Sequence, residues 1–141
     1  MIPPPLKRYL SSILIGIVLF WNLQAALVFI LNPSPYIPSF QLEGIPGKVL
    51  VQGLGILFLM WNVPYVFACW NPIRNRLSLL EANLMQFIGL VGETLLYSSL
   101  PPTETILRAT VSRFILFDGI GLVFLLLALR ISQSSPRSYS S

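Results

Sequence analysis

Four long apolar segments are the feature that most limits what this 141-residue chain can form. Each approaches the roughly 20 residues that an α-helix needs to cross the hydrocarbon core of a bilayer. Only helices or closed barrels satisfy every backbone polar group in lipid. The segments therefore predict an all-α protein, a transmembrane four-helix bundle with spans at about Tyr9 to Leu31, Val49 to Trp70, Leu79 to Leu100 and Ile106 to Ile131.

Composition points the same way. Hydrophobic residues make up 55% of the chain and charged residues only 10%, whereas soluble domains are roughly 25% charged. Histidine is absent and Cys69 is the single cysteine, so an internal disulfide is excluded and metal or haem cofactors are not expected. The basic residues lie at the ends of the apolar segments, not on one clustered face, so we expect no nucleic-acid partner.

Proline and asparagine mark the ends of the segments. Asn-Pro pairs follow the first two segments, and Pro101-Pro102 follows the third; each disfavours helix at the preceding residue. The long connection, residues 32–48, carries four prolines, so we expect neither helix nor strand over much of its length. We predict a single transmembrane domain over residues 1–131, followed by a disordered polar tail, residues 132–141.

The first segment also invites comparison with a signal peptide, because Lys7 and Arg8 precede it. The apolar run continues as LVFIL past Ala25 and Ala26 without an A-x-A site, and it is too long for an ordinary signal-peptide core. We interpret it as a retained helix.

The distribution of lysine and arginine predicts orientation. With four spans, both termini and the second connection share one side, which holds six basic residues: Lys7, Arg8, Arg74, Arg76, Arg130 and Arg137. The other side holds two, Lys48 and Arg108. By the positive-inside rule, we expect a multi-pass protein of the cell membrane with both termini in the cytoplasm.

Two related stretches place an asparagine inside an apolar run. Asn22 lies in VLFWNLQAALVFILNP, residues 18–33, and Asn62 in LFLMWNVPYVFACWNP, residues 57–72. Internal duplication and chance similarity between apolar segments both remain open. In either case the sequence raises the question of what the two amides do.

Six polar residues inside the spans are the candidate site. At about 1.5 Å per helical residue, Glu93 and Arg113 lie at similar depths on adjacent antiparallel helices, and we expect them to pair, with Asn22 close by. Gln86 shares a helical face with Glu93 and with Gly89, and Gly89 and Gly92 are expected to let a neighbouring backbone approach. The hypothesis is a polar seam through the bundle, formed by Asn22, Asn62, Gln86, Glu93, Arg113 and Asp118.

This seam has two interpretations. Buried polar side chains often hydrogen-bond membrane helices together, typically contributing under about 2 kcal/mol each. Alternatively, charged residues in a membrane often mark a pathway or a site, here for a polar-headed lipophile such as a quinone, a lipid or a small substrate. No serine, threonine or cysteine has a histidine partner, so no catalytic residue is assigned and an enzyme is the less favoured class.

The layout resembles the small DoxX-like membrane proteins. It has four spans, a proline-rich first connection that begins NPSPY, and short remaining connections, over residues 9–131. The resemblance implies a four-helix bundle and a membrane subunit near quinone chemistry, because members are associated with quinone-linked oxidation complexes.

Three functions follow as expectations. The first is a non-catalytic accessory or scaffold subunit of a larger membrane complex, with the lipid bilayer and other membrane subunits as partners. The second is a small quinone- or lipid-binding membrane protein that uses the polar seam. The third is a membrane subunit of a quinone-linked oxidoreductase.

Overall fold

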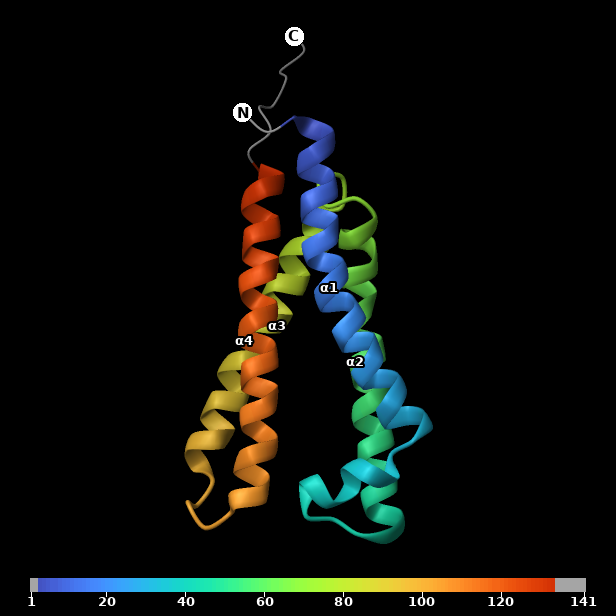
Figure 1. Cartoon of the computed structure of the whole chain (residues 1–141), viewed down its shortest axis with the longest axis vertical. Helices are drawn as coiled ribbons and strands as arrows, with labels where there is room; N and C mark the ends of the chain where they lie inside the picture. The colour runs from blue at the N-terminus through green and yellow to red at the C-terminus, as the bar shows by residue number, and fades with distance from the viewer. Residues whose placement is uncertain (1–2, 134–141) are drawn as a thin grey trace.

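The structure is a computed structural model that describes residues 3–133 of the chain (Figure 1). Within this range it contains four long α-helices and one short 3₁₀ helix, η1, and no strand. In chain order the elements are α1 (Pro4–Leu31), η1 (Ser34–Phe40), α2 (Gly44–Trp70), α3 (Arg76–Ser99) and α4 (Thr105–Gln133). The predicted all-α four-helix bundle is confirmed.

All four α-helices are long and apolar enough to cross a membrane, judged by length and composition. The protein is therefore a multi-pass membrane protein. Three helices begin several residues before the predicted spans, because hydropathy marks the apolar stretch and the polar first turn precedes it. Proline is tolerated in a first turn, where its missing N–H would have no partner, and α2 accordingly holds Pro46 in its first turn.

The connection between α1 and α2 differs from the prediction. Seven of its residues form η1, and α2 already begins at Gly44, so the expectation of mostly irregular structure over residues 32–48 is wrong. The prolines favour this short helix because they preset φ near the helical value. The φ of Pro33 is −68°, and its carbonyl accepts a hydrogen bond from the Tyr36 N–H at 2.9 Å.

The predicted polar tail is also partly wrong. Ser132 and Gln133 belong to the last turn of α4, where the Ser132 hydroxyl donates to the carbonyl of Leu129 at 2.8 Å. The remaining tail residues, 134–141, lie outside the described residues.

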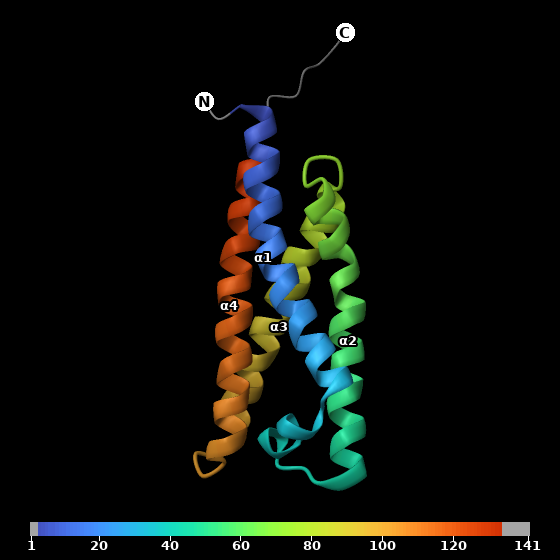
Figure 2. The same cartoon turned by 45° about the vertical axis from the view of Figure 1, so that its right-hand side comes forward.

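The bundle consists of two antiparallel hairpins, α1–α2 and α3–α4 (Figure 2). We call the half that contains the start of α1, the end of α4 and the α2–α3 turn the terminal half, and the opposite half the η1 half. In the terminal half the two hairpins lie together around one apolar core. That core takes two residues from each helix: Ile15, Val18, Tyr65, Ala68, Leu79, Ala82, Leu125 and Ala128.

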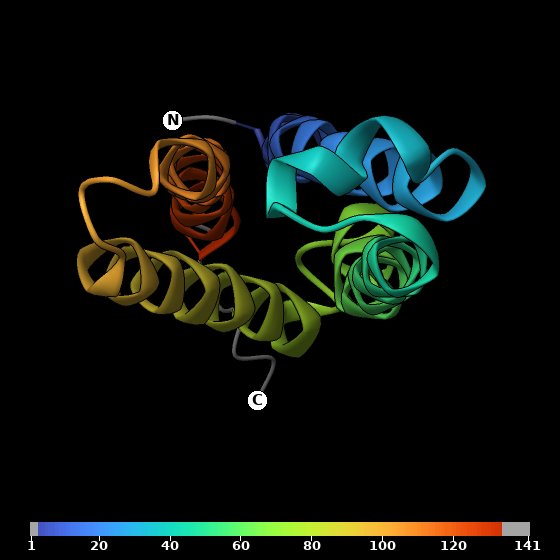
Figure 3. The same cartoon turned by 90° about the horizontal axis from the view of Figure 1, so that it is seen from below.

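In the η1 half the ribbons of the two hairpins diverge (Figure 1). Seen from this end, η1 lies across the opening between them (Figure 3). It reaches α4 through the Thr110 hydroxyl, which donates to the carbonyl of Ser39 at 2.7 Å, and through Phe40, whose ring stacks on Phe114 with centroids 6.4 Å apart. The short helix therefore connects the hairpins where the long helices separate.

Candidate functional site

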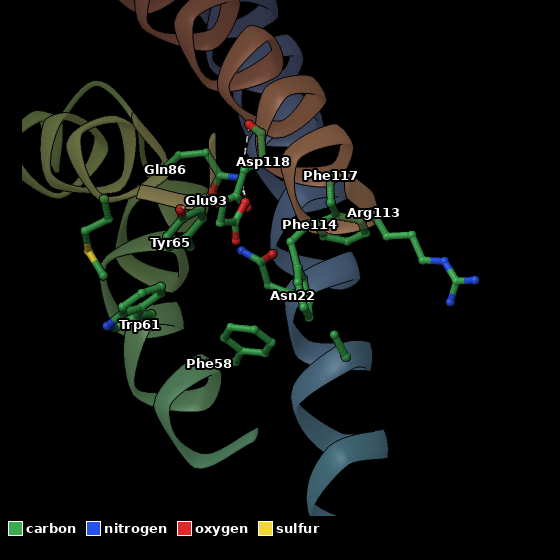
Figure 4. A pocket seen from close by; sticks show the side chains of 12 residues that line it. Asn22, Phe58, Trp61, Tyr65, Gln86, Glu93, Arg113, Phe114, Phe117 and Asp118 are labelled. Carbon is green, nitrogen blue, oxygen red and sulfur yellow. Dashed lines mark hydrogen bonds between the residues drawn. The ribbon is translucent and has the colours of Figure 1, made fainter. Parts of the chain in front are cut away.

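A cavity of about 170 Å³ lies at the centre of the bundle, where the hairpins begin to separate (Figure 4). All four long helices contribute to its lining. The lining residues are Asn22 and Ala25 from α1; Phe58, Trp61 and Tyr65 from α2; Met85, Gln86 and Glu93 from α3; and Arg113, Phe114, Phe117 and Asp118 from α4.

Three of these side chains form a hydrogen-bonded chain across three helices. Gln86 is buried, and its Nε2 donates to Asp118 Oδ1 at 2.9 Å. Its Oε1 accepts from the Tyr65 hydroxyl at 2.5 Å. The amide of Gln86 thus links α2, α3 and α4, which is the structural role that buried polar side chains commonly have in membrane proteins.

Two glycines make room for this chain. At Gly89, a Cβ would collide with Asp118 Oδ2, and at Gly121 a Cβ would lie 2.5 Å from Gln86 Nε2. The predicted close approach at Gly89 is therefore present, but a side chain approaches it and not a backbone. At Gly92 a Cβ would meet no heavy atom within 4 Å, so the close approach predicted there is wrong.

Glu93 differs from the other polar residues of the cavity. Its Oε2 is buried, yet it has no hydrogen-bond partner among the residues that the structure describes. Figure 4 shows its carboxylate and the Asn22 amide both pointing into the cavity. A buried, unsatisfied polar atom carries a free-energy penalty of roughly 1–3 kcal/mol, so this carboxylate is the group with the most to gain from a ligand.

The expected pair between Glu93 and Arg113 is not formed. Arg113 lines the cavity, but the residue is exposed and its guanidinium points away from Glu93 (Figure 4). The prediction rested on the similar depths of the two residues along their helices, but depth does not determine in which direction a side chain points. Arg113 is five residues from Asp118, about 140° around the helix at 3.6 residues per turn, and Asp118 occupies the interior face.

The two Trp-Asn pairs have different settings. Asn22 lines the cavity. Asn62 is buried on α2, where its Nδ2 donates to the carbonyl of Phe58, one turn earlier on the same helix, at 2.7 Å. The Asn62 side chain is absent from the cavity lining. The predicted seam thus gathers Asn22, Gln86, Glu93 and Asp118 at one cavity, whereas Asn62 and the guanidinium of Arg113 lie apart from it.

A second, larger cavity of about 520 Å³ extends from the first one into the η1 half. The two cavities share Phe58, Trp61, Glu93 and Phe114. The rest of its lining is apolar except for Thr110: Phe40, Leu54, Ile88, Gly89, Gly92, Leu96, Leu100, Leu107 and Val111. Glu93 is the one charged residue among the four that the two cavities share.

Sequence reasoning missed several residues of this region. Tyr65, which completes the hydrogen-bonded chain, and the aromatic lining were treated as ordinary apolar content. Asn83 was also missed; it is buried, and its Nδ2 donates to the carbonyl of Leu79 on α3 at 2.8 Å and lies 3.4 Å from that of Leu125 on α4. Its spacing of three residues from Gln86 was a usable signal, because residues three apart share a helix face.

Within residues 3–133, no three histidine, cysteine, aspartate or glutamate side chains gather as metal ligands would. Comparisons of the chain with protein families, with curated proteins and with solved structures found no match.

Proposed function

We propose that this multi-pass membrane protein binds a small polar-headed lipophile between its two hairpins. The observation that carries the proposal is Glu93, whose buried Oε2 has no partner among the described residues and faces a cavity. The head of the ligand binds beside Glu93 and Asn22, and its apolar part occupies the larger cavity. Ligand sites are typically apolar pockets with few polar groups that fix orientation.

The contrast with Gln86 supports a binding role over a purely structural one. A side chain that only joins helices should have its polar atoms satisfied by other helices, as both the Nε2 and the Oε1 of Gln86 are. Glu93 leaves one buried oxygen unsatisfied, as do Asn62 and Asn83, but of these three residues only Glu93 lines either of the two cavities, where a ligand can complete its hydrogen bonding.

A quinone and a lipid are the two lipophile classes that the sequence suggests. The resemblance to DoxX-like proteins favours a quinone, and it would place the protein as a membrane subunit near quinone-linked oxidation. The Asn22 amide is a donor that fits a quinone carbonyl. A lipid head with hydrogen-bond donors would instead satisfy Glu93 directly.

A role as accessory subunit of a larger membrane complex is a second candidate. The observation behind it is the small mass outside the helices: the α2–α3 and α3–α4 connections span only residues 71–75 and 100–104. Co-purification of stable membrane subunits in mild detergent would support this role. We further propose that the terminal half faces the cytoplasm, because five basic residues of the described chain lie at that end: Lys7, Arg8, Arg74, Arg76 and Arg130. Reporter fusions at Ser141 should then read cytoplasmic, and an external signal would contradict the orientation.

Native mass spectrometry of the purified protein tests the binding proposal. We expect the wild type to carry one lipophile per chain, and Gly92→Leu to lose it, because Gly92 lines the larger cavity, a Cβ there meets no atom within 4 Å, and the added side chain takes up cavity volume. Gly53→Leu is the matched control: a Cβ at Gly53 also meets nothing within 4 Å, and Gly53 lines neither cavity. Equal loading of wild type and Gly92→Leu would contradict the proposal.

A further inference from the structure

The central cavity combines acidic residues with aromatic rings. Glu93 and Asp118 both line it. Asp118 packs against Gly89, which lies four residues, about one helical turn, before Glu93 on α3. Of the lining residues only Arg113 is basic, and its guanidinium points away from the cavity (Figure 4).

Five of the twelve lining residues are aromatic: Phe58, Trp61, Tyr65, Phe114 and Phe117. These rings also hold one another in place. Phe58 lies with its centroid 6.3 Å from that of Trp61 and 6.2 Å from that of Phe114. Phe117 is held in turn by Trp21, at 5.5 Å. Rings grouped around an acidic cavity are the arrangement by which proteins recognise ammonium groups, through cation–π attraction to the ring faces.

From these two features we infer that the ligand head is a cation, an amine or a quaternary ammonium group attached to an apolar tail. The inference rests on the proposed function and specifies the chemistry of the same site. An ionised carboxylate inside a membrane needs a countercharge, and within the cavity Arg113 does not supply one. A cationic head supplies it next to Glu93, while the rings surround the apolar surface of the head.

Two other kinds of head fit the cavity less well. An anionic phosphate would lie beside two carboxyl groups and be repelled. A quinone presents only carbonyl acceptors, so it gives Glu93 a partner only when that carboxyl group carries a proton. The cation therefore satisfies more of the observed groups than either alternative does.

Calorimetry on the full chain in nanodiscs, corrected with empty nanodiscs, tests the inference. The probes are octyltrimethylammonium, 1-octanol and octanoate, which share a tail and carry a cationic, a neutral and an anionic head. We expect the wild type to bind octyltrimethylammonium at least about tenfold more tightly than 1-octanol. Glu93→Gln, nearly the same in shape, should remove this preference and leave the affinity for 1-octanol within about twofold.

Glu81→Gln is the matched control, because it makes the same change at an exposed position of α3 that lines neither cavity; it should retain the preference. Trp61→Leu should weaken cation binding about threefold or more while 1-octanol binding changes little. If the wild type bound 1-octanol as tightly as the cation, or if Glu93→Gln kept the preference, the cationic head would be refuted while lipophile binding stood. Failure of all three probes to bind would overturn both proposals.

Discussion

Both halves of the bundle consist mainly of apolar residues, but these residues pack differently in the two halves. In the terminal half, all four helices meet around a core in which Ile15, Leu79 and Leu125 are completely buried. In the η1 half, the hairpins separate and apolar side chains such as Leu107 line a cavity. Both regions are apolar, so hydrophobicity does not distinguish them.

The difference comes from small residues and from what faces them. Ala68, Ala82 and Ala128 let the helices of the terminal half approach, which is how membrane helices gain packing energy without a hydrophobic driving force. Towards the η1 half, the aromatic side chains Phe58, Trp61 and Phe114 lie between the hairpins and line both cavities. The terminal half thus holds the two hairpins together, and the η1 half leaves a cavity between them.

The largest expected effect compares one leucine from each half. Leu125→Ala should lower the free energy of unfolding by about 2–5 kcal/mol, because the fully buried side chain leaves a void. Leu107→Ala should lower it by less than about 1 kcal/mol, because its side chain already borders a cavity. Steric trapping in bicelles measures both values. Equal losses would show that the two halves are packed alike.

An intermediate effect is expected at the boundary between the halves. Gly89→Ala should destabilise the protein by about 2 kcal/mol, because its Cβ collides with Asp118 and disturbs the hydrogen bond to Gln86. Gly92→Ala should change stability little, since a Cβ there meets nothing. Combining Gly89→Ala with Asp118→Ala tests the cause: the losses should be far from additive in a double-mutant cycle, and additivity would mean that the contact is unimportant.

The smallest expected effect has the opposite sign. Glu93→Leu should raise the free energy of unfolding of the ligand-free protein by up to about 1 kcal/mol, because it removes a buried oxygen that lacks a partner. Gln86→Leu, the same kind of change at a satisfied side chain, should instead lower it. A clear loss of stability in Glu93→Leu would mean that Glu93 has a structural role.

The sequence was sufficient for the four long helices and insufficient for the directions of side chains. Four apolar runs predicted the four α-helices, because length and hydropathy are local properties of the chain. The 3₁₀ helix η1 was not predicted, because the prolines of the connection were interpreted only as residues that end a long helix. They also preset φ near the value of a short helix.

The site was predicted in part for the same reason. Gln86, Glu93 and Gly89 follow helical spacing, and in the structure Gln86 lines the central cavity, Gly89 lines the larger one and Glu93 lines both. Arg113 could not be placed, because its direction depends on which face of α4 packs against α3. The role of Tyr65 could not be predicted from its own segment either, because its hydroxyl donates a hydrogen bond to Gln86 on another helix.

The most direct test of a ligand-binding cavity between the hairpins is a crystal structure of the protein. The crystals are grown from a lipidic mesophase, and the lipids are carried through purification. The account predicts density that is not protein in the central cavity, in contact with Glu93 Oε2, with an apolar extension into the larger cavity of the η1 half. Hairpins packed together along their whole length, with Glu93 paired to Arg113 and both cavities filled by side chains, would contradict it.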